Sequence, residues 1–342
     1  MQGLILLAGP IFRKKLVCHY DSLSEDTPGK THLGISQIDP HLCTHLIYSY
    51  VGIDDTGSLD IIPTDIPKFQ AFNALKESYP QLQTFLEVNL MLDIPALLTT
   101  ITTPQGRRIF IDSTANILQT YQFDGLNIFW MNRKNYQAVN PHLFSELIEE
   151  LSATGIHLTA SVSAEESVID DSYEFQAIAD KVDFFNVVTA GIDINFVSDP
   201  SDTLFQKTKS AMEYLVSKGA PKRKLIVGIA AFGRAFALTP KPDGSGLGPD
   251  KTAPLLGYFS DTPGRWAYSE LCHHTSATKD KIANAWVGYE SMATIAEKAK
   301  YIREQDFEGA FVMSINLDDF SGKHCHQGNY PVIQKLHEKL NA

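Results

Sequence analysis

The feature that most constrains the fold is a repeated alternation of short apolar runs with amphipathic stretches. Eight runs have the length of a buried strand, at residues 16–20, 45–51, 84–88, 125–129, 157–161, 184–188, 225–230 and 310–315. Helical spacing follows at residues 68–78, 105–121, 141–153, 172–179, 203–217 and 291–304. Strands that alternate with helices are typical of parallel sheets, and eight such repeats predict an α/β fold, a closed (β/α)8 TIM barrel.

One interval breaks this alternation. Residues 235–284 are rich in Gly and Pro and show no helical period. A long irregular span inside a compact barrel is usually an inserted subdomain or a functional loop. We therefore expect an insertion subdomain at 235–284, between barrel strands seven and eight. The barrel domain then comprises residues 12–234 and 285–342.

The charge balance excludes some partners. The chain has 342 residues, with 29 Lys plus Arg against 40 Asp plus Glu and a formal net charge of −11. This balance disfavours a non-specific hold on nucleic acid or on an anionic membrane surface. No apolar run reaches the roughly 18 to 20 residues that a membrane span needs. We predict neither a nucleic-acid partner nor a membrane span.

The N-terminus and the cysteines bear on the cellular compartment. Residues 3–8 are apolar, as in a secretion signal, but no basic residue precedes them, so residues 1–11 fit either a signal remnant or a frayed strand. The four cysteines, Cys18, Cys43, Cys272 and Cys325, allow three disulfide pairings, and the sequence alone does not choose among them. Disulfides favour an oxidising compartment and hence an extracellular, secreted protein.

A metal site is the alternative use of two cysteines. His41 and His45 flank Cys43 at alternate positions, and His residues lie on both sides of Cys325. Structural zinc sites usually rest on ligand pairs separated by two to four residues, which differs from both patterns. We predict disulfides, no metal and no cofactor.

Six segments, in order, carry a specific resemblance. They are residues 16–20 (LVCHY), 43–48 (CTHLIY), 224–236 (KLIVGIAAFGRAF), 264–272 (GRWAYSELC), 286–290 (WVGYE) and 317–322 (LDDFSG). Over nearly its whole length the chain resembles glycoside hydrolase family 18, the chitinases and chitinase-like proteins. The resemblance implies an α+β insertion subdomain and the disulfides Cys18–Cys43 and Cys272–Cys325.

The family's fourth strand ends in D-G-x-D-x-D-W-E. In the family the final Glu protonates the glycosidic oxygen, and the Asp two residues earlier orients the substrate's acetamido group for attack on the anomeric carbon. Residues 123–131 read FDGLNIFWM, so Asn127, Phe129 and Met131 stand where the family has Asp, Asp and Glu. Met131 has no acidic proton and Phe129 has no lone pair, so we predict that this barrel is not an active chitinase.

Other positions of a sugar site also depart from the family. The resemblance implies sugar-stacking tryptophans where this chain has Leu23, Met91 and Met313, and an N-acetyl contact where it has Ala190 and Gly191. Methionine replaces the stacking area of an aromatic ring only in part. The mouth of the barrel is then either plugged by apolar side chains or shaped for a more apolar ligand.

Some side chains remain as candidates for ligand binding: Tyr20, Glu87, Trp130, Arg234 and Met313. Tyr20 and Trp130 are at strand ends and are expected to line the mouth. Glu87 ends the third strand, and a buried Glu there requires Arg234, a hydroxyl or a ligand beside it.

Three functions fit these observations. The first is a secreted, non-catalytic chitinase-like protein that acts as a binding or signalling module, with weak or no chitin binding and a cell-surface or extracellular protein partner. The second is a lectin for chitin or N-acetylglucosamine oligosaccharides. The third is a residual glycosidase that uses Glu87 or Glu165 as a relocated acid.

Overall fold

The computed structural model of the chain describes residues 14–26, 31–90, 94–131, 140–189, 200–240, 247–276 and 285–342. The segment 1–11, with its possible secretion signal, lies outside the described residues. Within the described part of the chain, no helix combines the length and the apolarity that a bilayer crossing needs.

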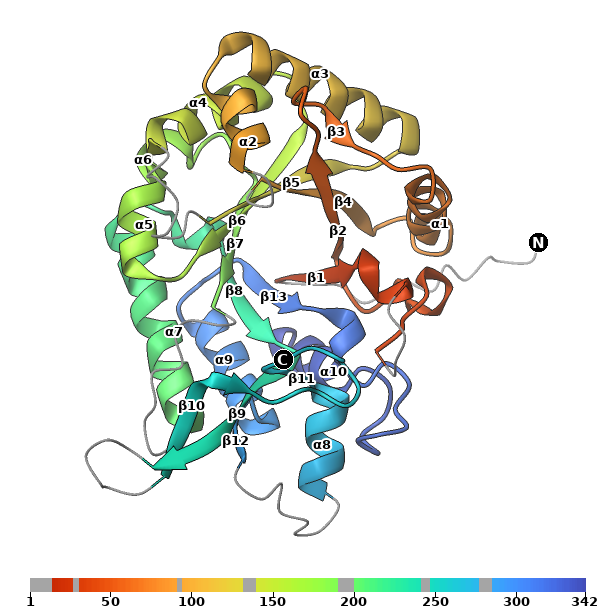
Figure 1. Cartoon of the computed structure of the whole chain (residues 1–342), viewed down its shortest axis with the longest axis vertical. Helices are drawn as coiled ribbons and strands as arrows, with labels where there is room; N and C mark the ends of the chain where they lie inside the picture. The colour runs from red at the N-terminus through yellow and green to blue at the C-terminus, as the bar shows by residue number, and fades with distance from the viewer. Residues whose placement is uncertain are drawn as a thin grey trace, which may run out of the picture.

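The core of the molecule is a closed barrel of parallel strands (Figure 1). Both β13 and β2 pair with β1, and this closes the sheet. The barrel confirms the predicted (β/α)8 fold. Its strands are β1 (Lys15–Asp21), β2 (His45–Ile53), β4 (Gln83–Asn89), β5 (Gly125–Trp130), β6 (His157–Ser163), β7 (Phe184–Val188), β8 (Leu225–Ala230) and β13 (Gly309–Met313).

Helices surround the barrel, and Figure 1 shows them as its outer layer. They are α1 (Asp65–Ser78), α2 (Ile94–Ile101), α3 (Pro104–Tyr121), α4 (Pro141–Ser152), α5 (Glu166–Ser172), α6 (Phe175–Ile178), α7 (Pro200–Ser217), α9 (Met292–Glu304) and α10 (Pro331–Leu340). A short strand, β3 (Leu59–Asp60), pairs with β2. Single 3-10 turns are η1 (Ser22–Glu25), η2 (Ile35–Gln37), η3 (Lys222–Lys224) and η4 (Ile315–Leu317).

Capping residues explain where several helices begin. Asn140 accepts a hydrogen bond from the His142 amide at the start of α4, and Pro141 takes the first position of that helix. At α10, which the alternation of apolar runs does not predict, the Val332 and Ile333 amides donate to the Asp318 carboxyl group. Burial raises the pKa of Asp318 to about 7, against the lowering effect of these amides.

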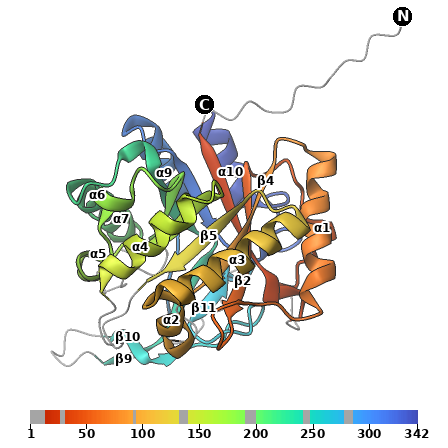
Figure 2. The ribbon, with the colours of Figure 1, turned by 90° about the horizontal axis from the view of Figure 1, so that it is seen from above.

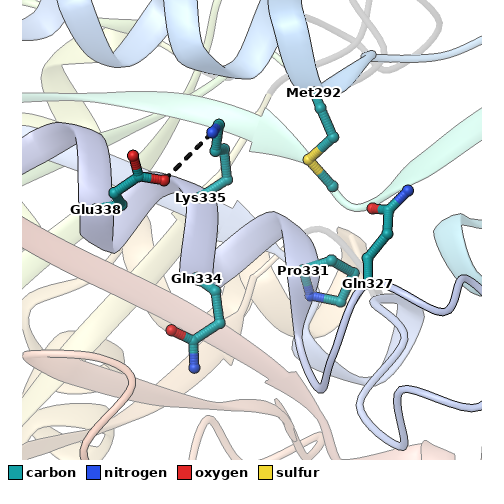
Figure 3. Close-up of a pocket in the computed structure, with 6 residues that line it drawn as sticks. All are labelled: Met292, Gln327, Pro331, Gln334, Lys335 and Glu338. Carbon is teal, nitrogen blue, oxygen red and sulfur yellow. Dashed lines mark hydrogen bonds and ion pairs between the residues drawn. The ribbon is translucent and has the colours of Figure 1, made fainter.

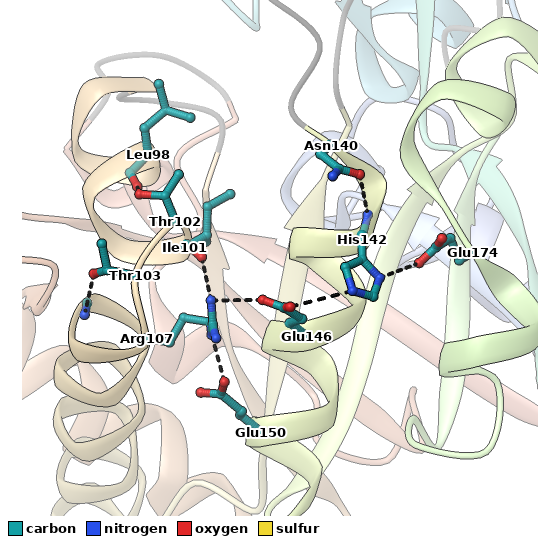
Figure 4. Close-up of polar contacts among 11 residues, drawn as sticks. Leu98, Ile101, Thr102, Thr103, Arg107, Asn140, His142, Glu146, Glu150 and Glu174 are labelled. Carbon is teal, nitrogen blue, oxygen red and sulfur yellow. Dashed lines mark hydrogen bonds and ion pairs between the residues drawn. The ribbon is translucent and has the colours of Figure 1, made fainter.

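One buried arginine joins three of the helices (Figure 4). Arg107 of α3 lies 3.0 Å from Glu146 and 2.8 Å from Glu150, both on α4. Its guanidinium also donates to the carbonyl of Ile101, the last residue of α2. Because the arginine is buried, these contacts fix the helices that follow β4 and β5 against one another.

A second, antiparallel sheet lies at one end of the barrel, the lower edge of Figure 2. Its strands are β9 (Phe232–Pro240), β10 (Leu247–Pro254), β11 (Arg265–Ala267) and β12 (Ala285–Gly288), and α8 (Tyr268–Ser276) follows β11. These elements stand between β8 and β13 in the chain. The boundaries of a separate folding unit at 235 and 284 remain a prediction.

Both disulfides join the cysteines that the family resemblance implies. Cys18 of β1 pairs with Cys43, just before β2, with 6.1 Å between the Cα atoms. Cys272 of α8 pairs with Cys325 after β13, with 5.2 Å between the Cα atoms. The thiols of the alternative metal sites are therefore used in disulfide bonds.

A buried ion pair connects the second sheet to the barrel. The Lys298 ammonium of α9 lies 2.9 Å from Glu290 Oε1, two residues after β12, and both side chains are almost wholly buried. The Ala230 amide at the end of β8 donates to the same carboxylate oxygen. The pair therefore holds the return of the chain from β12 against the end of β8.

Replacing Lys298 by Met should lower the free energy of unfolding by about 3 to 5 kcal/mol, because it leaves the buried Glu290 carboxylate without its counter-ion. Adding Glu290→Gln should recover most of that loss, since the amide still accepts from Ala230. Urea unfolding of both variants measures this. A double variant as unstable as the single one would contradict it.

Candidate functional site

The inward face of β5 contains the residues that stand in place of the family's carboxylates. Side chains alternate along a strand, so Asn127 and Phe129 face the barrel interior and Trp130 faces outward. Trp130 is fully buried and stacks on Phe144 of α4, with 4.8 Å between ring centroids.

The expectation that Tyr20 and Trp130 line the mouth of the barrel is wrong. Both are fully buried between the barrel and its helices. Tyr20 packs against Tyr48 and Phe72, and its hydroxyl donates to the Leu33 carbonyl. The physical reason is the two-residue period of a strand, which turns Tyr20 outward when its neighbour His19 faces inward.

Asn127 is the centre of a hydrogen-bond network across the barrel interior. Its amide nitrogen donates to Glu87 Oε2 at 2.7 Å and to the Ser161 hydroxyl at 2.9 Å. Its amide oxygen accepts from the Thr159 hydroxyl at 2.7 Å and from the Asn186 amide at 3.1 Å. Both donor hydrogens and both acceptor sites are therefore used, in a residue with no exposed surface.

Glu87 is the negative charge of this network. The side chain is 1% exposed, and its Oε1 atom accepts from the Ser49 hydroxyl at 2.8 Å and lies 3.0 Å from His19 Nε2. The hydroxyl that a buried Glu87 requires is thus Ser49, and His19 is a second partner. Arg234 lies in β9, with its guanidinium 5.7 Å from the Phe232 ring.

The environment of His19 favours its charged form. Burial lowers the pKa of the imidazole, but the Glu87 carboxylate raises it through its charge and its hydrogen bond, and Asp21 raises it further. The lowering effect of Arg265 is smaller, and the net pKa of His19 is above its usual 6.5. The raised pKa of His19 favours a buried ion pair with Glu87, in which His19 Nε2 and Glu87 Oε1 are 3.0 Å apart.

These contacts leave Glu87 poorly suited to the role of a relocated acid. A general acid must reach the oxygen that it protonates and must carry a proton to give. Glu87 is buried, accepts from Ser49 and Asn127, and lies against His19. Glu165 and Glu166 are both exposed where α5 begins, as expected for solvated carboxylates.

Other side chains in the barrel interior are apolar. Phe129, Met131 and Met313 are half-buried and pack against an internal apolar cluster. That cluster consists of Val17, Ile47, Phe85, Phe184, Val188, Ile226 and Phe311. Phe129 and Met131 stand where the resemblance implies an Asp and the Glu, and both side chains add apolar surface to the barrel interior.

The other positions of the implied sugar site are on several different elements. Leu23 is 52% exposed on η1, where the resemblance implies a tryptophan. The other replaced positions, Met91, Ala190 and Gly191, lie outside the described residues. Arg234 belongs to the second sheet, paired in register with Arg265.

A surface groove of about 380 Å³ lies between α9 and α10, on the outside of the barrel (Figure 3). Its lining is polar apart from Met292 and Pro331, and Lys335 pairs with Glu338 within it at 3.2 Å. None of the residues that the sequence singles out lines it.

No single sequence motif contains most of the residues of the polar network. His19, Ser49, Ser161 and Asn186 belong to four different strands and to no common motif. The signal that could have found them is the strand register, because Ser49, Glu87 and Asn127 are paired neighbours on β2, β4 and β5. Polar residues at inward positions of adjacent strands indicate an internal network.

Comparisons with known proteins agree with this fold. A family profile described as Glycosyl hydrolases family 18 matches residues 15–318. Mouse chitotriosidase-1 is 28% identical to this chain, and the match covers 96% of this chain and 78% of chitotriosidase-1. Human chitinase-3-like protein 2 is 27% identical, and the match covers 99% of this chain and 95% of that protein. The solved structure of human YKL-39, described as a pseudo-chitinase with retained chitooligosaccharide binding, is 26% identical with a TM-score of 0.83, over 96% of this chain and all of that one.

Asn127→Asp should destabilise the fold by at least about 2 kcal/mol, because it removes both amide donors and places a second carboxylate against Glu87. Adding Glu87→Gln should restore most of the stability, because the amide at position 87 can then donate to the carboxylate at position 127. Thermal and urea unfolding of wild type, single and double variants measure this. Equal stability of the single and double variants would count against the network.

The stability of the barrel should also depend on the charge of His19. Its pKa is raised on folding, so its contribution is complete below about pH 6.5 and is lost as the pH rises through the folded value. The loss is about 1.4 kcal/mol for each pH unit between the two pKa values. Urea unfolding of wild type and His19→Gln from acid to alkaline pH measures it; parallel curves would rule out the ion pair.

Proposed function

Because the chain belongs to glycosyl hydrolases family 18, we propose that it is a secreted, non-catalytic chitinase-like protein that acts as a binding or signalling module. Its relatives include pseudo-chitinases such as YKL-39, and its two disulfides are consistent with an extracellular location.

The observation that carries this proposal is the column of Asn127, Phe129 and Met131. Asn127 has its full hydrogen-bonding capacity committed inside the barrel, and Phe129 and Met131 pack on the internal apolar cluster. A general acid supplies about 10² to 10⁴ in rate, and stabilisation of developing charge supplies a comparable factor. Neither Phe129 nor Met131 has a group that performs these roles.

A lectin for chitin-type oligosaccharides is the second candidate. The specific observation in its favour is that YKL-39 is described as a pseudo-chitinase with retained chitooligosaccharide binding. In this chain Met313 occupies one stacking position and the half-exposed Leu23 another, and both offer less area than an indole ring. We therefore propose that binding of chitin or other glycans is weak.

A chitin pull-down and a glycan array separate the two candidates. The leading proposal predicts little retention on chitin beads and no strong array signal, whereas a lectin is retained and selects N-acetylglucosamine oligomers. Assays with a fluorogenic chitobiose substrate test the third function at the same time. Turnover that disappears in Glu87→Gln would establish a relocated acid and overturn the proposal.

Restoring two of the lost carboxylates, with Phe129→Asp and Met131→Glu, should leave chitobiose hydrolysis at least about 100-fold below that of an active relative such as chitotriosidase. The reason is that Met313 still lacks a stacking ring, and Asn127 stays bonded to Glu87 instead of supporting the carboxylate introduced by Phe129→Asp.

The control is a thermal melt, which must show that this double variant folds. Near-normal hydrolysis would mean that only those two residues separate this barrel from an active one.

A further inference from the structure

Exposed apolar side chains occur in several of the segments that follow barrel strands. In the described part of the chain, the large apolar side chains with more than a third of their surface exposed are Leu23, Ile62, Ile66, Leu98, Leu256 and Tyr258. Each follows the carboxyl end of β1, β2, β4 or β8 in the chain. In a (β/α)8 barrel those connections form the face that carries function.

Three of these residues lie on η1 or around the start of α1, where several acidic residues also lie. We call this group the η1–α1 patch, and it consists of Leu23, Asp26, Asp60, Ile62, Asp65 and Ile66. Lys68 of α1 lies 2.7 Å from Asp26, which ties the helix to η1. Asp65 accepts from the Ile62 amide, and the charges of Asp60 and Asp26 both act on it, so these acids lie near one another at the start of α1.

Negative charge dominates the patch. Residues 31–67 contain neither Lys nor Arg, and Lys68 is the cation paired with Asp26. Burial raises the pKa of Asp65, and the charges of Asp60 and Asp26 raise it further, against the lowering effects of the Ile62 amide and Lys68. The Asp65 carboxylate thus gains more from an added cation than an isolated one would.

We propose that the η1–α1 patch docks a basic segment of a protein partner that carries aliphatic side chains. This inference rests on the proposed function as a binding module and names the chemistry of its partner. Leu23, Ile62 and Ile66 would bury aliphatic groups of the partner, while Asp26, Asp60 and Asp65 would face its Lys or Arg side chains.

The composition of the patch disfavours sugars, anionic lipids and nucleic acid as its ligands. A sugar ring packs best on a flat aromatic side chain, and the six residues of the patch include none. Anionic lipid headgroups and nucleic acid would be repelled by its carboxylates. A cationic, aliphatic polypeptide segment matches both the charge and the shape of these side chains.

The test uses the full chain and a fluorescent synthetic peptide of Lys, Arg and Leu, with a second peptide in which Ser replaces every Leu. Anisotropy at low salt should show binding of the first peptide. Ile62→Ser with Ile66→Ser should weaken it about tenfold without changing any charge. Asp26→Asn with Asp60→Asn should weaken it as much and flatten its dependence on salt.

Matched controls come from surfaces away from the patch. Leu98→Ser removes an apolar side chain of similar exposure, and Asp112→Asn with Glu304→Gln removes two carboxylates that pair with exposed cations on α3 and α9. Both controls should bind the peptide as wild type does. Absent binding, or equal binding by patch and control variants, would overturn the proposal.

The same proteins separate this inference from the proposed function. The patch variants should show the same lack of chitobiose hydrolysis and the same response to chitin beads as wild type. Hydrolysis of chitobiose by the wild-type protein would refute the proposed function. A protein that does not hydrolyse chitobiose and does not distinguish the two peptides would refute only the proposed docking site.

Discussion

The hydrogen bond from the Asn127 amide to the Glu87 carboxylate is the interaction on which the rest of the barrel interior depends. It joins two neighbouring strands at their inward faces, and His19 lies against the other oxygen of the same carboxylate. A buried carboxylate is costly without partners, and here a hydroxyl, an amide and an imidazole all serve it. The family has an Asp where this chain has Asn127; beside Glu87, a second carboxylate would repel the first.

In this arrangement the positions where the family resemblance implies catalytic carboxylates take part in hydrogen bonding and packing inside the barrel. The family resemblance implies carboxylates on the inward face of β5, whereas here the buried carboxyl group belongs to Glu87 on β4 and the inward residues of β5 are Asn127 and Phe129. Phe129 and Met131 then extend the apolar cluster inside the barrel toward its mouth, where Met313 joins them. Met131, which stands where the family resemblance implies the acid, is part of this packing.

The sequence predicts the barrel well and the site only in part. All eight barrel strands are located by their apolar runs, because burial on both faces makes such strands conspicuous. Helix α10 is missed because it is amphipathic only over a short span and starts from a cap at Asp318, a residue distant in sequence. The predicted orientation of Tyr20 and Trp130 is wrong because the two-residue period of a strand, and not a position near its end, decides which way a side chain points. The contacts of Glu87 depend on the register between neighbouring strands, which no local motif contains.

The most direct test of the central claim is prolonged incubation of chitohexaose with stoichiometric protein in ¹⁸O-labelled water, followed by mass spectrometry of the products. Because no described side chain at the position of the lost acid can donate a proton, we predict no label above that of a protein-free control. Labelled products that vanish in Glu87→Gln would contradict the account and show that the buried carboxylate still works as an acid.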